Sequence, residues 1–520
     1  MSSVTADNLI DQLLAEQKTL QTPVARFSEI HHRRGSDLAD HYRSLIPLTK
    51  PGSGEQYAFE VSLDRCTGCK ACVSACHSLN GLDDHEVWRD VGIILGGSAA
   101  PTYQQTITTA CHHCEDPGCM NGCPVGAYEK DAGTGIVRHL DDQCIGCSYC
   151  ILKCPYDVPK YSKKRGIVRK CDMCHQRLAE GEAPACVQAC PTEAIRIVKV
   201  PTKSPVAALF IPDLATASTL ADSKITRPTT RYIGREVPAT AYAADRSALI
   251  PQHAHWPLVC MLMLTQAGIG LLFTARGELS LTLAGAGIFF SGMAASVLHL
   301  GQPLKAWRFF LGLRTSWLSR EILAFSLFAP IPVALVGFAA LPLLPFHPLI
   351  TAYAPFLALG AQVTAYSAFP LGLLAVFTSV MIYHDTHRSL WRFPLGATRF
   401  FGTVAAFATL GNLIAYPTLL AATFFAAAVV LKLIPEIAFL RPRHLEWTPD
   451  QHSAQLQLGP LRRILLLRIF FAIVAISVSI ISPWAALPLL LLAELFERQL
   501  FFQSVQAPKM PGSFGPHIPH

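Results

Sequence analysis

Cysteine spacing constrains this chain more than any other feature. Sixteen of its seventeen cysteines fall between residues 66 and 190, in four runs of four. The runs are Cys66-x2-Cys69-x2-Cys72-x3-Cys76, Cys111-x2-Cys114-x4-Cys119-x3-Cys123, Cys144-x2-Cys147-x2-Cys150-x3-Cys154 and Cys171-x2-Cys174-x11-Cys186-x3-Cys190. Proline follows the last cysteine of the second, third and fourth runs. A chain with so many closely spaced thiols must fold around the groups that those thiols bind.

This spacing is typical of the cysteine ligands of bacterial [4Fe–4S] ferredoxins, in which proline follows the fourth ligand. Four thiolates per cluster predict four clusters, and all sixteen cysteines are then used. Disulfides would require an oxidising compartment, and we find no secretory signal ahead of these runs. Zinc would suit isolated Cys-x2-Cys pairs, but not four such runs. The haem c pattern at Cys171–His175 is rejected because haem would take two ligands from one run.

In two-cluster ferredoxins the fourth cysteine of each run binds the neighbouring cluster. The second and third runs lie close together in sequence and are expected to form one such pair. The first and fourth runs then form an outer pair into which the inner pair is inserted. Short β-type segments, such as 57–61 and 194–198, alternate with the runs. We therefore expect an α+β ferredoxin-like domain made of two interleaved two-cluster modules.

Composition changes sharply near residue 250. The first half is polar, whereas the second is dominated by Leu, Ala, Phe, Ile and Gly with long uncharged stretches. Only 15% of all residues are charged. The net charge of +7 does not indicate that the chain binds nucleic acid, because the basic residues lie mainly between apolar segments. The second half is expected to be an all-α transmembrane bundle that contacts lipid.

Eight apolar segments follow Trp256, each near the ~17–25 residues that a membrane-spanning helix needs. They are approximately 256–275, 279–300, 322–345, 362–383, 400–416, 419–439, 464–482 and 484–502. The expected domains are a helical arm (1–55), the cluster domain (56–200), an extended linker (201–255), an eight-helix membrane domain (256–502) and a tail (503–520).

Basic residues between the segments predict the topology. They are Lys224, Arg227, Arg231, Arg235 and Arg246 before the first segment, then Lys305, Arg308, Arg314, Arg320, Arg388, Arg392, Arg399, Arg441, Arg443, Arg462, Arg463 and Lys509 in alternate loops. The opposite side has Arg276 alone. Because basic loops stay in the cytoplasm, we expect a multi-pass protein of the cytoplasmic membrane, with both termini and the cluster domain inside. Arg33-Arg34 is followed by no apolar stretch and is not a twin-arginine export signal.

Two groups of motifs resemble known proteins. Cys144-Ile-Gly-Cys-Ser-Tyr-Cys and Arg169-Lys-Cys-Asp-Met-Cys resemble the four-cluster electron-transfer subunit of dimethyl sulfoxide reductase and related molybdoenzymes. His299-Leu-Gly-Gln-Pro and Ser316-Trp-Leu-Ser-Arg-Glu resemble the membrane anchor subunit of the same enzymes. The chain is thus similar to a fusion of those two subunits, over roughly residues 56–500.

The resemblance implies that quinol, either menaquinol or ubiquinol, is oxidised at the anchor. Electrons would then pass through four [4Fe–4S] clusters to a separate molybdopterin-containing catalytic subunit. The resemblance implies the same pairing of runs as the ferredoxin spacing. The predicted ligand sets are Cys66, Cys69, Cys72 and Cys190 (site 1); Cys171, Cys174, Cys186 and Cys76 (site 2); Cys111, Cys114, Cys119 and Cys154 (site 3); and Cys144, Cys147, Cys150 and Cys123 (site 4). Well-known bacterial members act on the outer face of the membrane, whereas the charges here place the clusters inside.

Oxidising a quinol releases two protons, so residues near the membrane surface must accept them. His299 ends the second apolar segment and Glu321 begins the third. A histidine can hydrogen-bond a quinol hydroxyl and titrate near neutral pH, and a nearby carboxylate can take the proton onward. The resemblance places both at the anchor family's quinol site, where Arg320 would adjust the charge. The alternative for His299 is a histidine that caps the helix end.

Other polar residues in the membrane half have simpler explanations. Lys432, Glu436, Arg468 and Glu494 lie towards one end of their segments, so we expect them to extend to the surface or to pair with one another. Cys260 is expected to be a small packing residue. Haem b is not expected, because His299 alone lies near the membrane interior.

The sequence contains no evident catalytic site for a terminal substrate, so that chemistry is expected in the partner. The direction of electron flow stays open. A dehydrogenase partner could instead send electrons through the clusters to quinone. A third class of function, a redox-driven ion-translocating module, would favour charged residues at mid-membrane depth, whereas those here lie towards one side.

Overall fold

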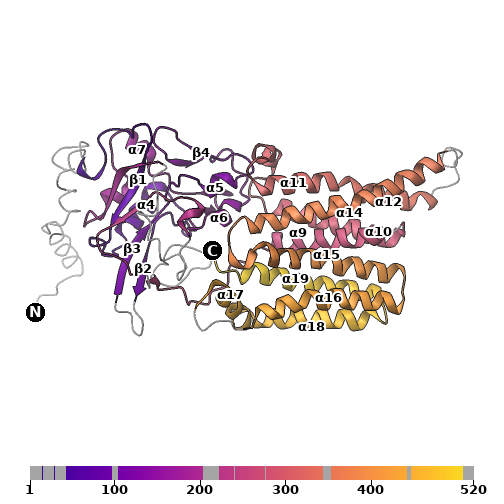
Figure 1. Cartoon of the computed structure of the whole chain (residues 1–520). Coiled ribbons are helices and arrows are strands. Elements are labelled where there is room, and N and C mark those ends of the chain that lie inside the picture. The colour runs from indigo at the N-terminus through magenta and orange to yellow at the C-terminus, as the bar shows by residue number, and fades with distance from the viewer. Residues whose placement is uncertain are drawn as a thin grey trace, which may run out of the picture.

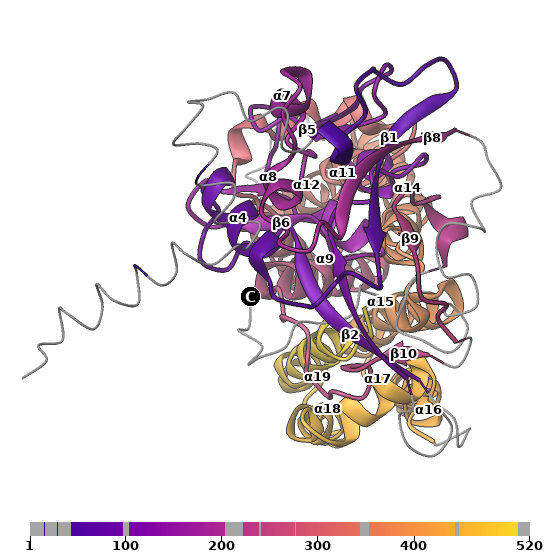
Figure 2. The same cartoon turned by 90° about the vertical axis from the view of Figure 1, so that its left-hand side faces the viewer.

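The computed structural model describes residues 43–96, 103–202, 222–238, 241–275, 277–343, 353–441 and 447–507, together with Ala15 and Glu29. Most of the expected N-terminal arm, part of the linker and most of the expected tail lie outside these residues. Within them the chain forms a domain of small sheets and short helices beside a bundle of long helices (Figure 1). Seen from the sheet-containing end, that domain lies in front of part of the bundle, while α16 and α18 remain visible below it (Figure 2).

Two three-stranded sheets organise the first domain. In one, β1 (Glu55–Ser62) pairs antiparallel with β8 (Ile195–Pro201) and parallel with β9 (Arg231–Ile233). This pairing brings the segments before the first cysteine run and after the last run side by side. In the other, β2 (Asp90–Gly96) lies between β3 (Tyr103–Thr109) and β10 (Tyr242–Ala243).

The remaining strands form two small antiparallel pairs between the cysteine runs. They are β4 (Tyr128–Lys130) with β5 (Val137–His139), and β6 (Lys160–Ser162) with β7 (Ile167–Arg169). Strands were expected at 57–61 and 194–198, where β1 and β8 confirm them. The expected linker is more ordered than a tether, because β9 and β10 from that segment each extend a sheet.

Short helices lie within and around the cysteine runs. They are η1 (Arg43–Leu45), α4 (Ala71–Asn80), α5 (Gly118–Asn121), α6 (Tyr149–Lys153), α7 (His175–Ala179), α8 (Ala185–Gln188) and η4 (Ser223–Ile225). Side chains of the cysteine runs pack with the sheets, since buried cysteines share one core with residues such as Phe59, Ile107 and Ile197. Covalent attachment of these cysteines to clusters would therefore tie the short elements together.

Among the described residues of the second half, five helical segments are long and apolar enough to cross a membrane. They are α9 (Trp256–Thr274), α10 (Leu279–Leu298), the segment Trp317–Leu343 made of α11 (Trp317–Phe328), α12 (Pro330–Ala340) and η6 (Leu341–Leu343), then α14 (Ala354–His384) and α16 (Leu419–Phe439). Large apolar side chains are exposed on them, among them Val333, Phe356 and Leu419. Apolar exposure on this scale is typical of a lipid-facing surface.

Three more long helices pack in the same bundle (Figure 1). They are α15 (Phe393–Ala415), α18 (Arg462–Ser479) and α19 (Pro483–Gln503). The end of the bundle nearest the first domain carries three shorter elements, η5 (Pro303–Gly312), η7 (Ser389–Trp391) and α17 (Pro449–Leu458). Helix α17 falls in a segment expected to be a loop, where the Thr448 side chain caps it by accepting from the Gln451 amide.

Three helices begin well before their apolar segments. The third spanning segment begins at Trp317 rather than 322, α14 at Ala354 rather than 362, and α15 at Phe393 rather than 400. Arg320, expected in the preceding loop, instead lies in the first turn of α11, where the neighbouring Ser319 and Glu321 are buried. Burial against other protein elements removes the polar residues from lipid, so helix and apolar segment need not coincide.

Charged side chains from α15, α16, α18 and α19 form a buried network inside the bundle. Its members are Arg399, Lys432, Glu436, Arg468, Glu494, Glu497 and Arg498. Glu494 is central, because it pairs with Lys432, lies 3.0 Å from Arg468 Nη2 and accepts from Thr403 Oγ1 at 2.7 Å. The expected pairing among Lys432, Glu436, Arg468 and Glu494 is thus confirmed. Arg399, expected in a loop, instead lies buried in α15 and pairs with Glu497.

Replacing Glu494 with glutamine is expected to destabilise the bundle by about 3–5 kcal/mol, because two cations stay buried without their carboxylate. The matched control is Asp450→Asn, which breaks the partly exposed pair with Arg392 and should cost about 0–1 kcal/mol. Thermal denaturation of the detergent-solubilised chain, followed by circular dichroism, measures both variants. Equal midpoints for the two would contradict a stabilising role for the network.

Candidate functional site

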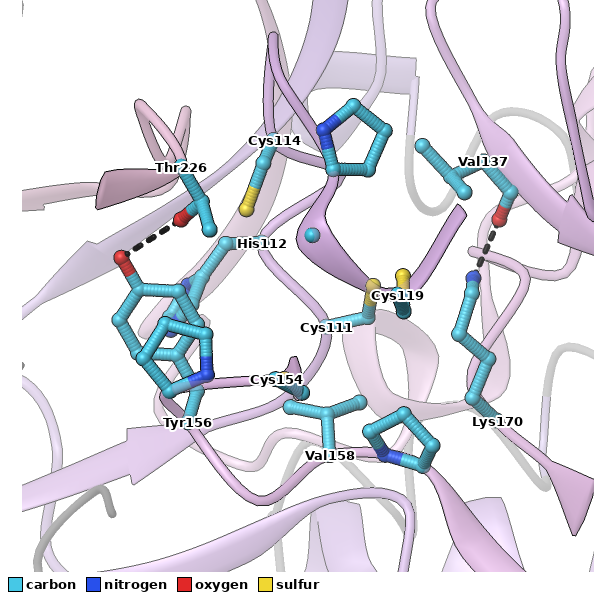
Figure 3. A pocket seen from close by; sticks show the side chains of 14 residues that line it. Cys111, His112, Cys114, Cys119, Val137, Cys154, Tyr156, Val158, Lys170 and Thr226 are labelled. Atoms are coloured by element: carbon cyan, nitrogen blue, oxygen red, sulfur yellow. Dashed lines mark hydrogen bonds between the residues drawn. The ribbon is translucent and has the colours of Figure 1, made fainter. Parts of the chain in front are cut away.

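Two pockets in the first domain are lined by cysteines from different runs. One pocket is lined by Cys111, Cys114, Cys119 and Cys154, the set named site 3 (Figure 3). A second pocket is lined by Cys66, Cys69, Cys72 and Cys190, the set named site 1. In each pocket three cysteines of one run meet the last cysteine of another run.

The cysteines of sites 2 and 4 lie within electrostatic reach of one another. Cys76 interacts with Cys174 and Cys186, and Cys171 interacts with Cys76 and Cys186 as well as with Cys111 of site 3. At site 4, Cys150 interacts with Cys123, Cys144 and Cys147. Here too the last cysteine of a run lies with three cysteines of a different run.

One backbone feature recurs in the first Cys-x2-Cys loop of each run. The residue just before the second cysteine has a positive φ angle: Gly68 (76°), His113 (42°), Gly146 (69°) and Met173 (59°). This left-handed conformation reverses the backbone direction from one cysteine to the next, so both can face the same pocket. Glycine adopts it without cost in two loops, whereas His113 and Met173 must be held there by their surroundings.

Gly146 is expected to be the glycine least tolerant of substitution in these loops. A Cβ there would lie 2.4 Å from Gly166 O and 2.9 Å from Gly301 Cα, so Gly146→Ala adds a backbone clash to the strain. Gly181→Ala is the matched control, because its φ is +80° with nothing within 4 Å of the added Cβ. Left-handed alanine costs about 1–2 kcal/mol at either position.

Iron analysis of the purified variants separates the two effects. Gly146→Ala should lose iron from site 4, falling to about three-quarters of the wild-type content if one of four clusters is lost. Gly181→Ala should keep its iron. Full iron in both variants would show that the close approach at Gly146 is not required.

The donor groups fit iron–sulfur clusters. Burial raises the pKa of Cys76 to about 12 and that of Cys154 to about 11, so these thiols would be neutral unless a strongly cationic group bound them. Among the described residues, no three His, Cys, Asp or Glu side chains come close enough to share one metal ion.

Site 4 lies against the membrane bundle. The segment that follows α10 bonds to the backbone around its cysteines: His299 Nε2 lies 2.7 Å from Cys147 O, the Gln302 amide donates to Ile145 O, and the Gly312 amide donates to Pro124 O. Ser316 Oγ donates to Gly122 O at 2.7 Å. The segment holding the proposed quinol residues is therefore fixed directly onto the loops of site 4.

His299, Glu321 and Arg320 occupy different surroundings. His299 does end α10, yet its ring bonds to Cys147 O rather than to its own helix. Glu321 is 3% exposed and accepts from Ser379 Oγ at 2.5 Å. Arg320 is turned away into the preceding loop, where it donates to Leu313 O and Arg314 O and stacks on Trp317. Each side chain thus has its own partner.

Two tyrosines near Glu321 were not identified from the sequence. Tyr149, between the second and third cysteines of the third run, is buried in the core of the membrane bundle. The Tyr149 hydroxyl donates to Ile382 O at 3.1 Å. Tyr149 and Tyr383 both lie close enough to Glu321 for an electrostatic interaction. The sequence motif contains Tyr149, but nothing in it indicates contact with the membrane helices.

A second contact joins the halves beside Tyr149. Lys153 Nζ pairs with Asp385 at 2.7 Å and also donates to Asp385 O at 2.8 Å. Arg388, which is buried, interacts with Asp157 and Cys154 of the first domain. The loop between α14 and α15 therefore packs on the same face of the first domain as His299.

Comparison with known proteins identifies the first domain. Residues 103–200 match the family described as "4Fe-4S dicluster domain". The B subunit of the anaerobic dimethyl sulfoxide reductase of Haemophilus influenzae is 40% identical over 150 residues, which are 27% of this chain and 73% of that protein. The thiosulfate reductase electron transfer subunit of Salmonella typhi is 38% identical over 144 residues, 27% of this chain and 74% of that protein.

The iron-sulfur subunit of the nitrate-inducible formate dehydrogenase of Escherichia coli is 35% identical over 169 residues, 28% of this chain and 57% of that protein. All three relatives are named as redox-complex subunits, and the matches cover about a quarter of this chain. The helical remainder fits a fused membrane anchor, with five apolar membrane-length helices among the described residues. The protein belongs to the family of iron–sulfur electron-transfer subunits that includes the B subunit of anaerobic dimethyl sulfoxide reductase.

Proposed function

We propose that this chain oxidises quinol at the end of its membrane bundle and delivers the electrons to a separate molybdopterin oxidoreductase. One contact supports this most: the bond between His299 Nε2 and Cys147 O, which joins the proposed quinol site to site 4. The bundle has eight spanning helices in this proposal. The loops that carry the basic residues contact the cluster domain. This contact supports the placement of those loops and the cluster domain on the same, cytoplasmic side of the membrane.

Sites 1 to 4 would each hold one [4Fe–4S] cluster through the four cysteines assigned to it. When bound, the clusters would carry single electrons between the quinol site and the partner. The chain's own contribution is to bury most of these thiols, to fix the loops by left-handed residues and to pack site 4 against the membrane domain. The contacts of the segment after α10 with the loops of site 4 support a position for this site next to the membrane domain.

His299 is suited to bind quinol in one tautomer. A carbonyl oxygen can only accept, so the bond to Cys147 O requires a proton on Nε2 and leaves the Nδ1 lone pair as an acceptor. A quinol hydroxyl could donate to that nitrogen. Glu321, held by Ser379, supplies a buried carboxylate for a proton, while Arg320 adds a positive charge at the margin of the site.

The partner is tested by affinity purification of the full chain from its native membrane. The captured complex should contain molybdenum in about equal amount to this chain and should catalyse quinol-dependent reduction of the partner's substrate. A partner that carries no molybdenum, or a complex that runs only from substrate to quinone, would contradict the proposal. The second outcome would favour the reverse flow of electrons.

A further inference from the structure

Lys170 is a buried cation at the boundary between two cysteine sites. It follows β7 and immediately precedes Cys171, and only 2% of it is exposed. Its ammonium donates to Val137 O, as Figure 3 shows, and to Cys171 O at 2.9 Å. The same side chain lines the pocket of site 3 with Cys111 and Cys119.

The two sites that meet at Lys170 are sites 2 and 3. Cys171 belongs to site 2, and its thiol interacts directly with that of Cys111 in site 3. The Lys170 charge acts on Cys111, Cys119 and Cys171, so it reaches thiols of both sets. The ammonium therefore lies where the two sites approach one another.

This charge lacks the partner that a buried lysine usually has. Both hydrogen bonds go to neutral carbonyl oxygens, and among the described residues none of the ion pairs includes Lys170. Burying a charge without an ion pair is costly unless other negative charge compensates it. Each site brings four thiolates, so the compensating charge is on the sites themselves.

We propose that Lys170 sets the reduction potentials of sites 2 and 3, acting as a fixed positive charge rather than as a ligand. The inference rests on the proposed function, because it requires clusters at both sites. Reduction adds a negative charge to a site, and a nearby ammonium in a medium of low dielectric constant stabilises the reduced form. Because one lysine acts on both sites, it raises both reduction potentials together. The difference between the two potentials, which drives electron transfer from one site to the other, therefore stays small.

Arg89 repeats this arrangement at the boundary of sites 1 and 2. It is also 2% exposed, and its charge acts on Cys72 of site 1 and on Cys76 and Cys186 of site 2. Its Nη1 donates to Thr108 Oγ1, which lies 3.5 Å from Cys72 Sγ. Two of the boundaries between neighbouring sites thus hold a buried cation.

The boundary between sites 3 and 4 differs. Tyr128, a neutral and buried side chain, interacts there with Cys119 of site 3 and with Cys123 and Cys150 of site 4. Removing the charge of Lys170 should therefore leave site 4 unaffected. We therefore expect the loss of the Lys170 charge to change the reduction potentials of sites 2 and 3 and to leave those of sites 1 and 4 unchanged.

Redox titration of the purified full chain, followed by EPR, tests the inference. Lys170→Gln keeps a donor for the two carbonyls but removes the charge, and should shift two of the four midpoint potentials downward with iron content unchanged. Lys170→Arg should restore both potentials towards wild type. Lys164→Met, at an exposed lysine of the β6–β7 hairpin, is the control for charge removal and should move none.

Four clusters with unchanged potentials in Lys170→Gln would overturn the inference. Iron loss that Lys170→Arg does not rescue would assign Lys170 a structural role and would also overturn it. If Lys170→Gln loses iron and Lys170→Arg retains it, Arg89→Gln repeats the test at sites 1 and 2. A wild-type chain with fewer than four clusters would instead contradict the proposed function itself.

Discussion

Replacing His299 with alanine should abolish reduction of the clusters by quinol while the chain keeps its iron. The substitution removes the Nδ1 acceptor proposed to bind the quinol hydroxyl, and losing a general base costs about 10²–10⁴-fold in rate. For site 4 the same change removes one hydrogen bond, at Cys147 O, worth about 1 kcal/mol. Stopped-flow absorbance of the clusters after mixing with quinol measures the rate, and dithionite then shows that the clusters are present.

Two further variants make the His299 result specific. Glu321→Gln keeps an acceptor for the Ser379 hydroxyl but cannot take a proton as a carboxylate does, so quinol reduction should also be lost. His384→Ala is the control, at the same end of the bundle in the last turn of α14. Quinol should reduce the clusters of this variant at the wild-type rate. Quinol reduction that survives in both His299→Ala and Glu321→Gln would place the site elsewhere.

Replacing Cys154 with serine should remove the cluster of site 3, although Cys154 lies in the third run. The expectation follows from the pocket that Cys154 lines with Cys111, Cys114 and Cys119. Iron should fall to about three-quarters of the wild-type content, because one of four clusters is lost. Cys260→Ser is the control: Cys260 is a half-buried residue of α9, and this variant should keep all of its iron.

Comparison of EPR spectra shows which cluster is missing from Cys154→Ser. Its spectrum should match that of Cys111→Ser, a site 3 variant, rather than that of Cys144→Ser, a site 4 variant. The opposite match would mean that each run binds its own cluster without exchange. The ligand sets proposed for all four sites would then be wrong.

Much of the cluster domain could be predicted because ligand spacing is a local property. A Cys-x2-Cys loop must reverse within two residues, and glycine at 68 and 146 provides the left-handed turn directly. His113 and Met173 adopt the same conformation without a sequence signal, because surrounding contacts hold them there. The strands β1 and β8 were predictable from their β-branched and aromatic residues.

The contacts between the two halves could not be predicted, because they join residues far apart in sequence. Tyr149 lies 233 positions from Ile382, whose carbonyl it contacts. Arg399 was assigned to a loop from its charge alone, but Glu497 neutralises it inside the bundle. Hydropathy likewise placed the start of α11 too late, since Glu321 is buried against Ser379 rather than exposed to water or lipid.

The most direct test of the proposed function mixes the purified full chain, without any partner subunit, with excess quinol under anaerobic conditions. The proposal predicts that cluster absorbance and EPR signals change on addition of menaquinol or ubiquinol, and that His299→Ala shows no such change. Clusters that respond to dithionite but not to either quinol would contradict it.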